Sequence, residues 1–151
     1  MSRPPPTLFR ARLLSNGRYT VMLNESGAGS SRWRELAVTR WREDLTSDGW
    51  GSFVLLRDFA SGAVWSVGRQ PCGGEPDAYD VTFSDGRAEI ARRDGTLATT
   101  LEVAVPGDHD AELRRVTITN RGDTAREIEL TSYAELVLGS ATADAAHPAF
   151  S

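Results

Sequence analysis

The sequence predicts an all-β protein built as an antiparallel two-sheet sandwich. Short apolar runs recur at intervals of roughly 8–12 residues, a spacing typical of sandwiches and barrels. Turn dipeptides such as Asn16-Gly17, Asp85-Gly86 and Asp94-Gly95 separate these runs and are strong hairpin signals. No window shows a helical period of useful length. We therefore expect at most a short helical turn.

The N-terminal part is expected to form an arm followed by a hairpin. Residues 1–7 contain three consecutive prolines, which favour an extended and weakly ordered segment. Residues 11–15 and 19–24 flank Asn16-Gly17 and should pair as neighbouring antiparallel strands. The chain of 151 residues has the length of one domain. Residues 8–151 are assigned to it.

The middle of the chain alternates between loops and strands. Glycine and serine are frequent in residues 25–31, which predicts a loop, and residues 43–50 form a second, polar loop. Ser61-Gly62 is expected to join two strands as a turn, and residues 70–77 are rich in proline and glycine. The strands expected here are residues 36–42, 52–57 and 64–68.

The second half is more regular. Val116 and Ile118 alternate with Arg115 and Thr117, as in a strand with one buried face. The same alternation recurs after Glu127. The strands expected here are residues 78–83, 87–92, 97–105, 113–120 and 127–138.

Composition excludes several classes of protein. Hydrophobic residues make up 40% of the chain and charged residues 25%, a globular balance. The net charge of -4 argues against a sequence-independent nucleic-acid binder. No apolar run approaches the roughly 20 residues of a membrane span. The single cysteine, Cys72, and the absence of a signal-like N-terminus lead us to expect a cytoplasmic protein.

No motif for catalysis or metal binding stands out. All 17 basic residues are arginine, so a lysine Schiff base is excluded. A nucleophilic Cys72 would need a histidine partner, and the two histidines lie in turn-like or terminal sequence. Asp108-His109-Asp110 resembles a metal-binding triplet, but it falls at a strand connection without a second ligand cluster nearby. We predict no catalytic residue, metal or cofactor in this chain.

One segment combines tryptophan and arginine. Three of the four tryptophans lie within residues 31–51. In a strand, Trp41 and Thr39 would share one face, and Arg40 and Arg42 the other. Indole rings stack on sugars, and arginine and carboxylate side chains form hydrogen bonds with hydroxyl groups. Alternatively, the tryptophans fill the core and the charged residues form surface ladders. The candidate carbohydrate or domain-interface residues are Arg32, Trp33, Arg34, Arg40, Trp41, Arg42, Glu43, Asp44 and Trp50.

Several long segments, this one included, resemble the N-terminal β-sandwich of the glycoside phosphorylases in glycoside hydrolase family 94. The version in cyclic β-1,2-glucan synthases is the most similar. The matching segments are residues 15–23, 31–34, 37–44, 50–52, 56–58, 63–66, 115–122, 127–135 and 147–151. The resemblance covers nearly everything after residue 10.

The resemblance implies a supersandwich like that of galactose mutarotase. In the family this domain precedes an (α/α)-barrel, which carries the catalytic acid and the phosphate-binding residues. No catalytic residue can therefore be carried over to this chain. We expect the chain to end within the sandwich domain, so that the domain is truncated at its C-terminus.

The resulting expectation is a carbohydrate-associated domain that is non-catalytic alone and supports a separate (α/α)-barrel. Its expected partners are a β-glucan oligosaccharide or that barrel. A homo-oligomer is also expected, because the apolar strand over residues 127–138 would leave a bare edge. The alternative is a purely structural or oligomerisation module without sugar affinity.

Overall fold

The computed structural model describes residues 10–41 and 51–146 of the chain, and these residues form an all-β fold with antiparallel strand pairing, as predicted. One short helix, α1 (Ala141–Ala146), follows the last strand. The strands are β1 (Ala11–Ser15), β2 (Tyr19–Asn24), β3 (Gly29–Trp33), β4 (Leu36–Thr39), β5 (Ser52–Asp58), β6 (Val64–Ser66), β7 (Ala78–Ser84), β8 (Arg87–Asp94), β9 (Leu97–Ala104), β10 (Leu113–Asn120), β11 (Ile128–Ala134) and β12 (Leu136–Ser140).

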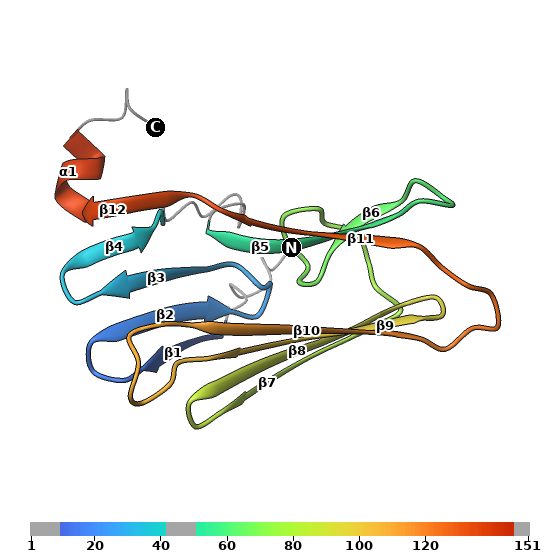
Figure 1. Cartoon of the computed structure of the whole chain (residues 1–151), viewed down its shortest axis with the longest axis horizontal. Helices are drawn as coiled ribbons and strands as arrows, with labels where there is room; N and C mark the ends of the chain where they lie inside the picture. The colour runs from blue at the N-terminus through green and yellow to red at the C-terminus, as the bar shows by residue number, and fades with distance from the viewer. Residues whose placement is uncertain (1–9, 42–50, 147–151) are drawn as a thin grey trace, which may run out of the picture.

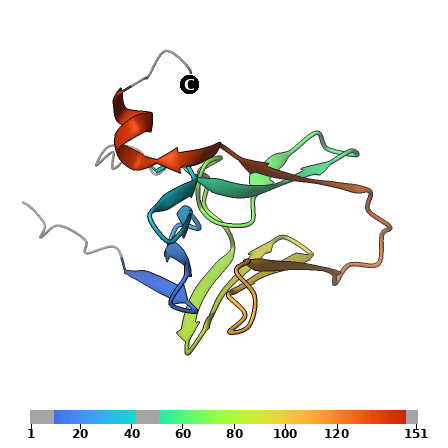
Figure 2. The same ribbon diagram turned by 60° about the vertical axis from the view of Figure 1, so that its left-hand side comes forward.

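Hydrogen bonding divides the strands into three sheets (Figure 1). A five-stranded sheet has the order β1-β2-β3-β4-β12, a four-stranded sheet the order β10-β9-β8-β7, and a three-stranded sheet the order β11-β5-β6. Figures 1 and 2 show the four-stranded sheet on the opposite side of the molecule from β5, β6 and β11. The arrangement is a sandwich in which the chain repeatedly crosses between layers.

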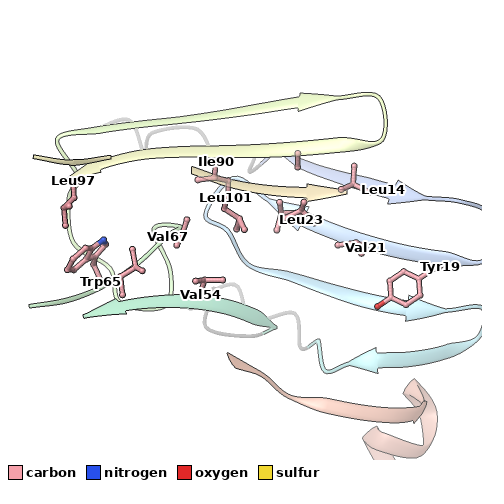
Figure 3. Packing of buried hydrophobic residues seen from close by; sticks show 13 residues of the cluster. Leu14, Tyr19, Val21, Leu23, Val54, Trp65, Val67, Ile90, Leu97 and Leu101 are labelled. Atoms are coloured by element: carbon pink, nitrogen blue, oxygen red, sulfur yellow. The ribbon is translucent and has the colours of Figure 1, made fainter. Parts of the chain in front are cut away.

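All three sheets contribute to one hydrophobic core. Leu23 comes from the five-stranded sheet, Leu56 and Trp65 from the three-stranded sheet, and Ile90 and Leu101 from the four-stranded sheet. Figure 3 shows Trp65 and Val54 on one side of this core and Leu97, Leu101 and Ile90 on the other. Because buried residues alternate with less buried ones along β8 and β9, each of these strands presents one face to the core.

The predicted turns of the second half are confirmed. Asp85-Gly86 joins β7 to β8, and the turn from β8 to β9 begins at Gly95, directly after Asp94, the last residue of β8. Gly86 and Gly95 have φ angles of 73° and 60°, a left-handed conformation that glycine adopts without steric cost. These turns are local, so the sequence alone could place them.

The predicted loop over residues 25–31 is wrong in its last part, because Gly29 to Ser31 belong to β3. Small residues are needed here, since a Cβ atom on Gly29 would lie 2.3 Å from the carbonyl oxygen of Met22. Pairing with β2 therefore imposes a strand on residues of low β-propensity. The predicted arm (residues 1–7) and polar loop (residues 43–50) lie outside the described residues.

The single strand predicted over residues 127–138 is two strands, β11 and β12, in different sheets. β11 pairs with β5 and β12 pairs with β4, with Glu135 between them. The register of β12 shifts between Leu136 and Gly139, and Leu138 has a φ of 54°. The predicted strand over residues 36–42 ends earlier, at Thr39.

Asp58 is a buried carboxylate at the end of β5 that holds the turn to β6. It accepts hydrogen bonds from Ser61 Oγ (2.9 Å), Arg126 Nη2 (2.6 Å) and the backbone N–H of Ala60 (3.0 Å). The hydrogen bond from Ser61, followed by that from Arg126, lowers the pKa of Asp58. The carboxylate thus links the β5–β6 turn to the segment that leads into β11.

We expect this carboxylate to make folding stability depend on pH in the acid range. Because the pKa of Asp58 is lower in the folded state, its stabilisation is present above the unfolded value of about 3.9. It is lost as the pH falls through the lower folded-state value. The free energy of unfolding, measured in urea between about pH 2 and 5, should therefore vary less with pH in Asp58→Asn than in wild type. Asp85→Asn changes an exposed carboxylate and is the control. Its free energy of unfolding should depend on pH as that of wild type does. The same dependence in Asp58→Asn as in wild type would contradict the expectation.

Candidate functional site

Trp33 presents an exposed aromatic ring at the end of β3. Its relative exposure is 38%, and Arg34 follows it in the turn to β4. The guanidinium of Arg34 lies over the indole, 5.3 Å from the ring centroid. Arg34 has a φ of 52° and donates its backbone N–H to the carbonyl of Arg18 at 2.7 Å. A non-glycine residue in this conformation is uncommon, and the bond to Arg18 holds it there.

Asp110 fixes the orientation of the Trp33 ring. Trp33 Nε1 donates to Asp110 Oδ2 at 2.9 Å, and Arg18 Nε donates to Asp110 Oδ1 at 2.8 Å. The hydrogen bond from Trp33 is the largest cause of a lowered pKa at Asp110, and bonds from Asn16 and Arg18 add to it. Asp110 is therefore ionised at neutral pH and acts as a charged acceptor for three side chains.

Asn16 connects this carboxylate to the β1–β2 turn. Its Oδ1 accepts the backbone N–H groups of Arg18 (2.9 Å) and Tyr19 (2.8 Å), which closes the turn. Its Nδ2 donates to Asp110 Oδ1 at 3.1 Å and to the carbonyl of His109 at 2.9 Å. The β1–β2 turn and the β9–β10 connection are thus joined through one amide side chain. We call Asn16, Arg18, Trp33, Arg34 and Asp110 the Trp33 platform.

A second contact holds β3 against the start of β10 beside this platform. Ser31 is 1% exposed, and its Oγ donates to Glu112 Oε2. Glu112 Oε1 accepts a hydrogen bond from Arg114 Nε at 2.6 Å. β3 and the β9–β10 connection are thus joined twice, once through Trp33 and once through Ser31.

The Trp33 platform has the chemistry of a surface that binds hydroxyl-rich ligands. An exposed indole offers an apolar face to sugar C–H groups, and guanidinium and carboxylate groups offer planar hydrogen bonds. The same contacts also have a structural effect, because Asp110 joins β3 to the β1–β2 turn.

The structure places the predicted site residues in separate locations. Trp33 and Arg34 lie together at the β3–β4 turn, whereas Arg32 lies on the opposite face of β3. Arg40 and Trp41 follow the other end of β4. The side chain of Arg40 is 12% exposed and pairs with Glu135, with Nη1 and Oε2 3.3 Å apart.

Trp41 lies outside the strand that was predicted to contain it, the one over residues 36–42. It follows the end of β4 and is partly exposed, because the strand stops at Thr39. The buried tryptophan is Trp65, with a relative exposure of 9%. The remaining candidates, Arg42, Glu43, Asp44 and Trp50, lie outside the described residues.

Sequence reasoning missed the groups that orient Trp33. The sequence identifies Asn16 only as a turn residue, and Asp110 only as part of an acidic triplet. Asp110 lies 77 positions after Trp33, so no local pattern could pair them. The sequence offered one hint of this contact, which was the number of polar turn-forming residues in the β1–β2 turn and in the β9–β10 connection.

The described part of the chain shows neither a metal cluster nor a membrane-spanning helix. Within residues 10–41 and 51–146, no group of three or more histidine, cysteine, aspartate or glutamate side chains is placed to hold a metal ion. No helix in those residues is long and apolar enough to cross a membrane.

Fold and platform together define a class: an antiparallel β-sandwich domain with an exposed, anchored aromatic side chain on its surface. Residues 2–151 match the family described as glycosyl hydrolase 94, supersandwich domain. The chain belongs to this family, and the resemblance seen in its sequence is confirmed.

Three relatives show the range of the family. The chain is 45% identical over 139 residues to the cyclic beta-(1,2)-glucan synthase NdvB of Rhizobium meliloti, a match covering 92% of this chain and 5% of that protein. It is 32% identical to the 3-O-beta-D-glucopyranosyl-beta-D-glucuronide phosphorylase of Paenibacillus borealis, covering 78% of this chain and 14% of the relative. It is 25% identical to the N,N'-diacetylchitobiose phosphorylase of Vibrio furnissii, covering 95% of this chain and 19% of that relative. The chain thus spans less than a fifth of the length of each.

Proposed function

We propose that this chain is a non-catalytic, carbohydrate-associated domain that supports a separate (α/α)-barrel catalytic domain. Its Trp33 platform contacts a β-glucan oligosaccharide. The observation that carries the proposal is the exposed Trp33 ring, whose N–H is held by Asp110 at 2.9 Å. A ring that is already oriented loses little conformational entropy when a sugar stacks on it.

The proposed ligand class comes from the relatives. The name of the Rhizobium meliloti protein contains a beta-(1,2)-glucan, and that of the Paenibacillus borealis protein contains a beta-D-glucopyranosyl unit. A β-1,2-linked glucan is the first ligand to test, because the synthase is 45% identical to this chain. The hydroxyl groups of such a glucan match the donors of Arg18 and Arg34 and the acceptors of Asp110.

The second part of the proposal, that this domain supports a catalytic barrel, rests on a different observation from the sugar contact. In each of the three relatives, more than four-fifths of the protein lies outside the matched region. In this proposal that remaining part supplies the catalytic groups. The sandwich contributes a rigid surface next to them.

Binding of β-1,2-linked glucan oligosaccharides tests the platform. Wild type should bind weakly, and Trp33→Ala should weaken binding by about tenfold, since an aromatic stacking contact contributes about 1.4 kcal/mol. Isothermal titration calorimetry measures both affinities. Phe59→Ala is the matched control, because Phe59 is 48% exposed and also lies 5.3 Å from a guanidinium, that of Arg57. Equal affinities in wild type and Trp33→Ala would exclude a sugar contact at this ring.

A structural or oligomerisation module without sugar affinity is the second candidate. It is favoured by the apolar side chains on β12, where Leu136 is 64% exposed and Leu138 is 70% exposed. Sedimentation velocity separates the two candidates. A discrete oligomer that binds no glucan would support the second candidate, and glucan binding by a monomer would support the first.

A further inference from the structure

Two arginine side chains of the Trp33 platform have hydrogen-bond donors that are not in use. The exposed guanidinium of Arg34 lies over the Trp33 ring and bonds to no acceptor within residues 10–41 and 51–146. Arg18, whose side chain is 44% exposed, donates its Nε to Asp110. Its two Nη groups have no hydrogen-bonded acceptor in the same part of the chain. A guanidinium carries five N–H donors in a planar fork, so both side chains can bind a further acceptor.

The carboxylate of the platform, in contrast, is nearly saturated with donors. Asp110 accepts Trp33 Nε1 at its Oδ2, and both Arg18 Nε and Asn16 Nδ2 at its Oδ1. A carboxylate has about four acceptor positions, and three hydrogen bonds already occupy this one. Glu35, which follows Arg34 in the turn, is exposed and forms no ion pair with it in the described ranges. The platform therefore offers a ligand many donors and few acceptors.

This excess of donors and of positive charge favours an anionic ligand over a neutral one. The whole chain has a net charge of -4, but the platform combines two guanidinium groups with a single carboxylate. A guanidinium matches a carboxylate in a planar, bidentate geometry. Hydrogen bonds of this charged kind are roughly twice as strong as those between neutral groups. A sugar that carries a carboxylate thus fits the unused donors better than a sugar with hydroxyl groups alone.

We propose that the Trp33 platform prefers an acidic sugar, in which a carboxylate replaces the hydroxymethyl group at C6, to a neutral glucose unit. The carboxylate accepts hydrogen bonds from the Arg34 guanidinium, and Arg18 adds a second positive charge near it. Trp33 supplies the apolar surface for the sugar ring. This inference rests on the proposed function, because it names the class of sugar that the same platform binds.

Two glycosides that differ only at C6 test the preference on the full chain. Methyl β-D-glucoside is neutral, and methyl β-D-glucuronide carries the carboxylate. Each is titrated while NMR follows the indole N–H signal of Trp33, which Trp33→Ala identifies among the four tryptophans. The glucuronide should bind about fivefold more tightly, as expected for a partly exposed charge pair. Added salt should reduce this ratio, because salt screens exposed charges.

Variants of Arg34 locate the preference. In Arg34→Gln, which removes the charge, the affinities for the two glycosides should become nearly equal. Arg34→Lys keeps the charge without the planar fork and should retain only part of the preference. Arg57→Gln is the matched control, because Arg57 lies 5.3 Å from the ring centroid of Phe59, as Arg34 does from that of Trp33. It should bind both glycosides as wild type does. Circular dichroism confirms that each variant folds.

The outcomes separate this inference from the proposed function. Equal affinities of wild type for the two glycosides, or no binding of either, would overturn the inference. A preference that persists in Arg34→Gln would also overturn it, because the carboxylate would then bind elsewhere. If wild type shows no preference but Trp33→Ala weakens glucan binding, the proposed function stands and only this inference fails. If Trp33→Ala changes no sugar affinity, both fail.

Discussion

Replacing Trp65 with alanine should destabilise the protein by about 3–5 kcal/mol, the usual cost of removing a buried aromatic side chain. Trp65 pairs with Leu56 across β5 and β6 and belongs to the core that all three sheets share. Its removal leaves a cavity between the three-stranded and four-stranded sheets, where Figure 3 places its ring. Urea unfolding followed by circular dichroism measures the loss.

Trp33→Ala is the natural control for this experiment. Trp33 is 38% exposed, against 9% for Trp65. Folding therefore removes less of the apolar area of Trp33 from water. We expect a clearly smaller loss of stability in Trp33→Ala. Equal losses in the two variants would mean that Trp33 packs as a core residue, and the platform would then have no free ring to offer a ligand.

Gly68→Ala should also be strongly destabilising, by about 3 kcal/mol, because the new methyl group has no room. A Cβ atom on Gly68 would lie 2.4 Å from the carbonyl oxygen of Ser26 and 2.9 Å from Gly27 Cα. Both are backbone atoms, which cannot rotate away. The carbonyl of Gly68 also accepts a hydrogen bond from the buried Arg92 Nη1 at 2.8 Å, so a backbone shift would weaken that bond.

Gly107→Ala is the matched control, because a Cβ atom on Gly107 would meet no atom within 4 Å beyond its chain neighbours. Thermal unfolding should show a large decrease in melting temperature for Gly68→Ala and almost none for Gly107→Ala. Similar, small decreases would show that the backbone crossing at Gly27 and Gly68 can relax.

Local features of the fold could be predicted from the sequence, and long-range ones could not. The Asn16-Gly17, Asp85-Gly86 and Asp94-Gly95 turns were correct because each depends on a few adjacent residues. The division at Glu135 was missed because residues 127–138 are uniformly strand-like. Only the pairing of β11 with β5 and of β12 with β4 separates them.

The same distinction applies to the candidate site. Trp33 and Arg34 were identified from their chemistry, which is visible in the sequence. Their anchor, Asp110, was not, because the hydrogen bond to Trp33 depends on how β3 packs beside the β9–β10 connection. Trp41 was misplaced for a related reason: alternation predicts which face a residue occupies, but not where the strand ends.

The position of β12 beside β4 has a consequence for how the protein folds. The pair Leu36–Ser140 joins residues about 100 positions apart, so the five-stranded sheet receives its last strand only when nearly all of the described chain exists. During synthesis β1 to β4 can associate early, since their pairings are between sequence neighbours. The edge of β4 then stays open until β12 emerges from the ribosome. Pairings between residues far apart in the sequence form more slowly than local ones, so we expect the β4–β12 pairing to form late in folding.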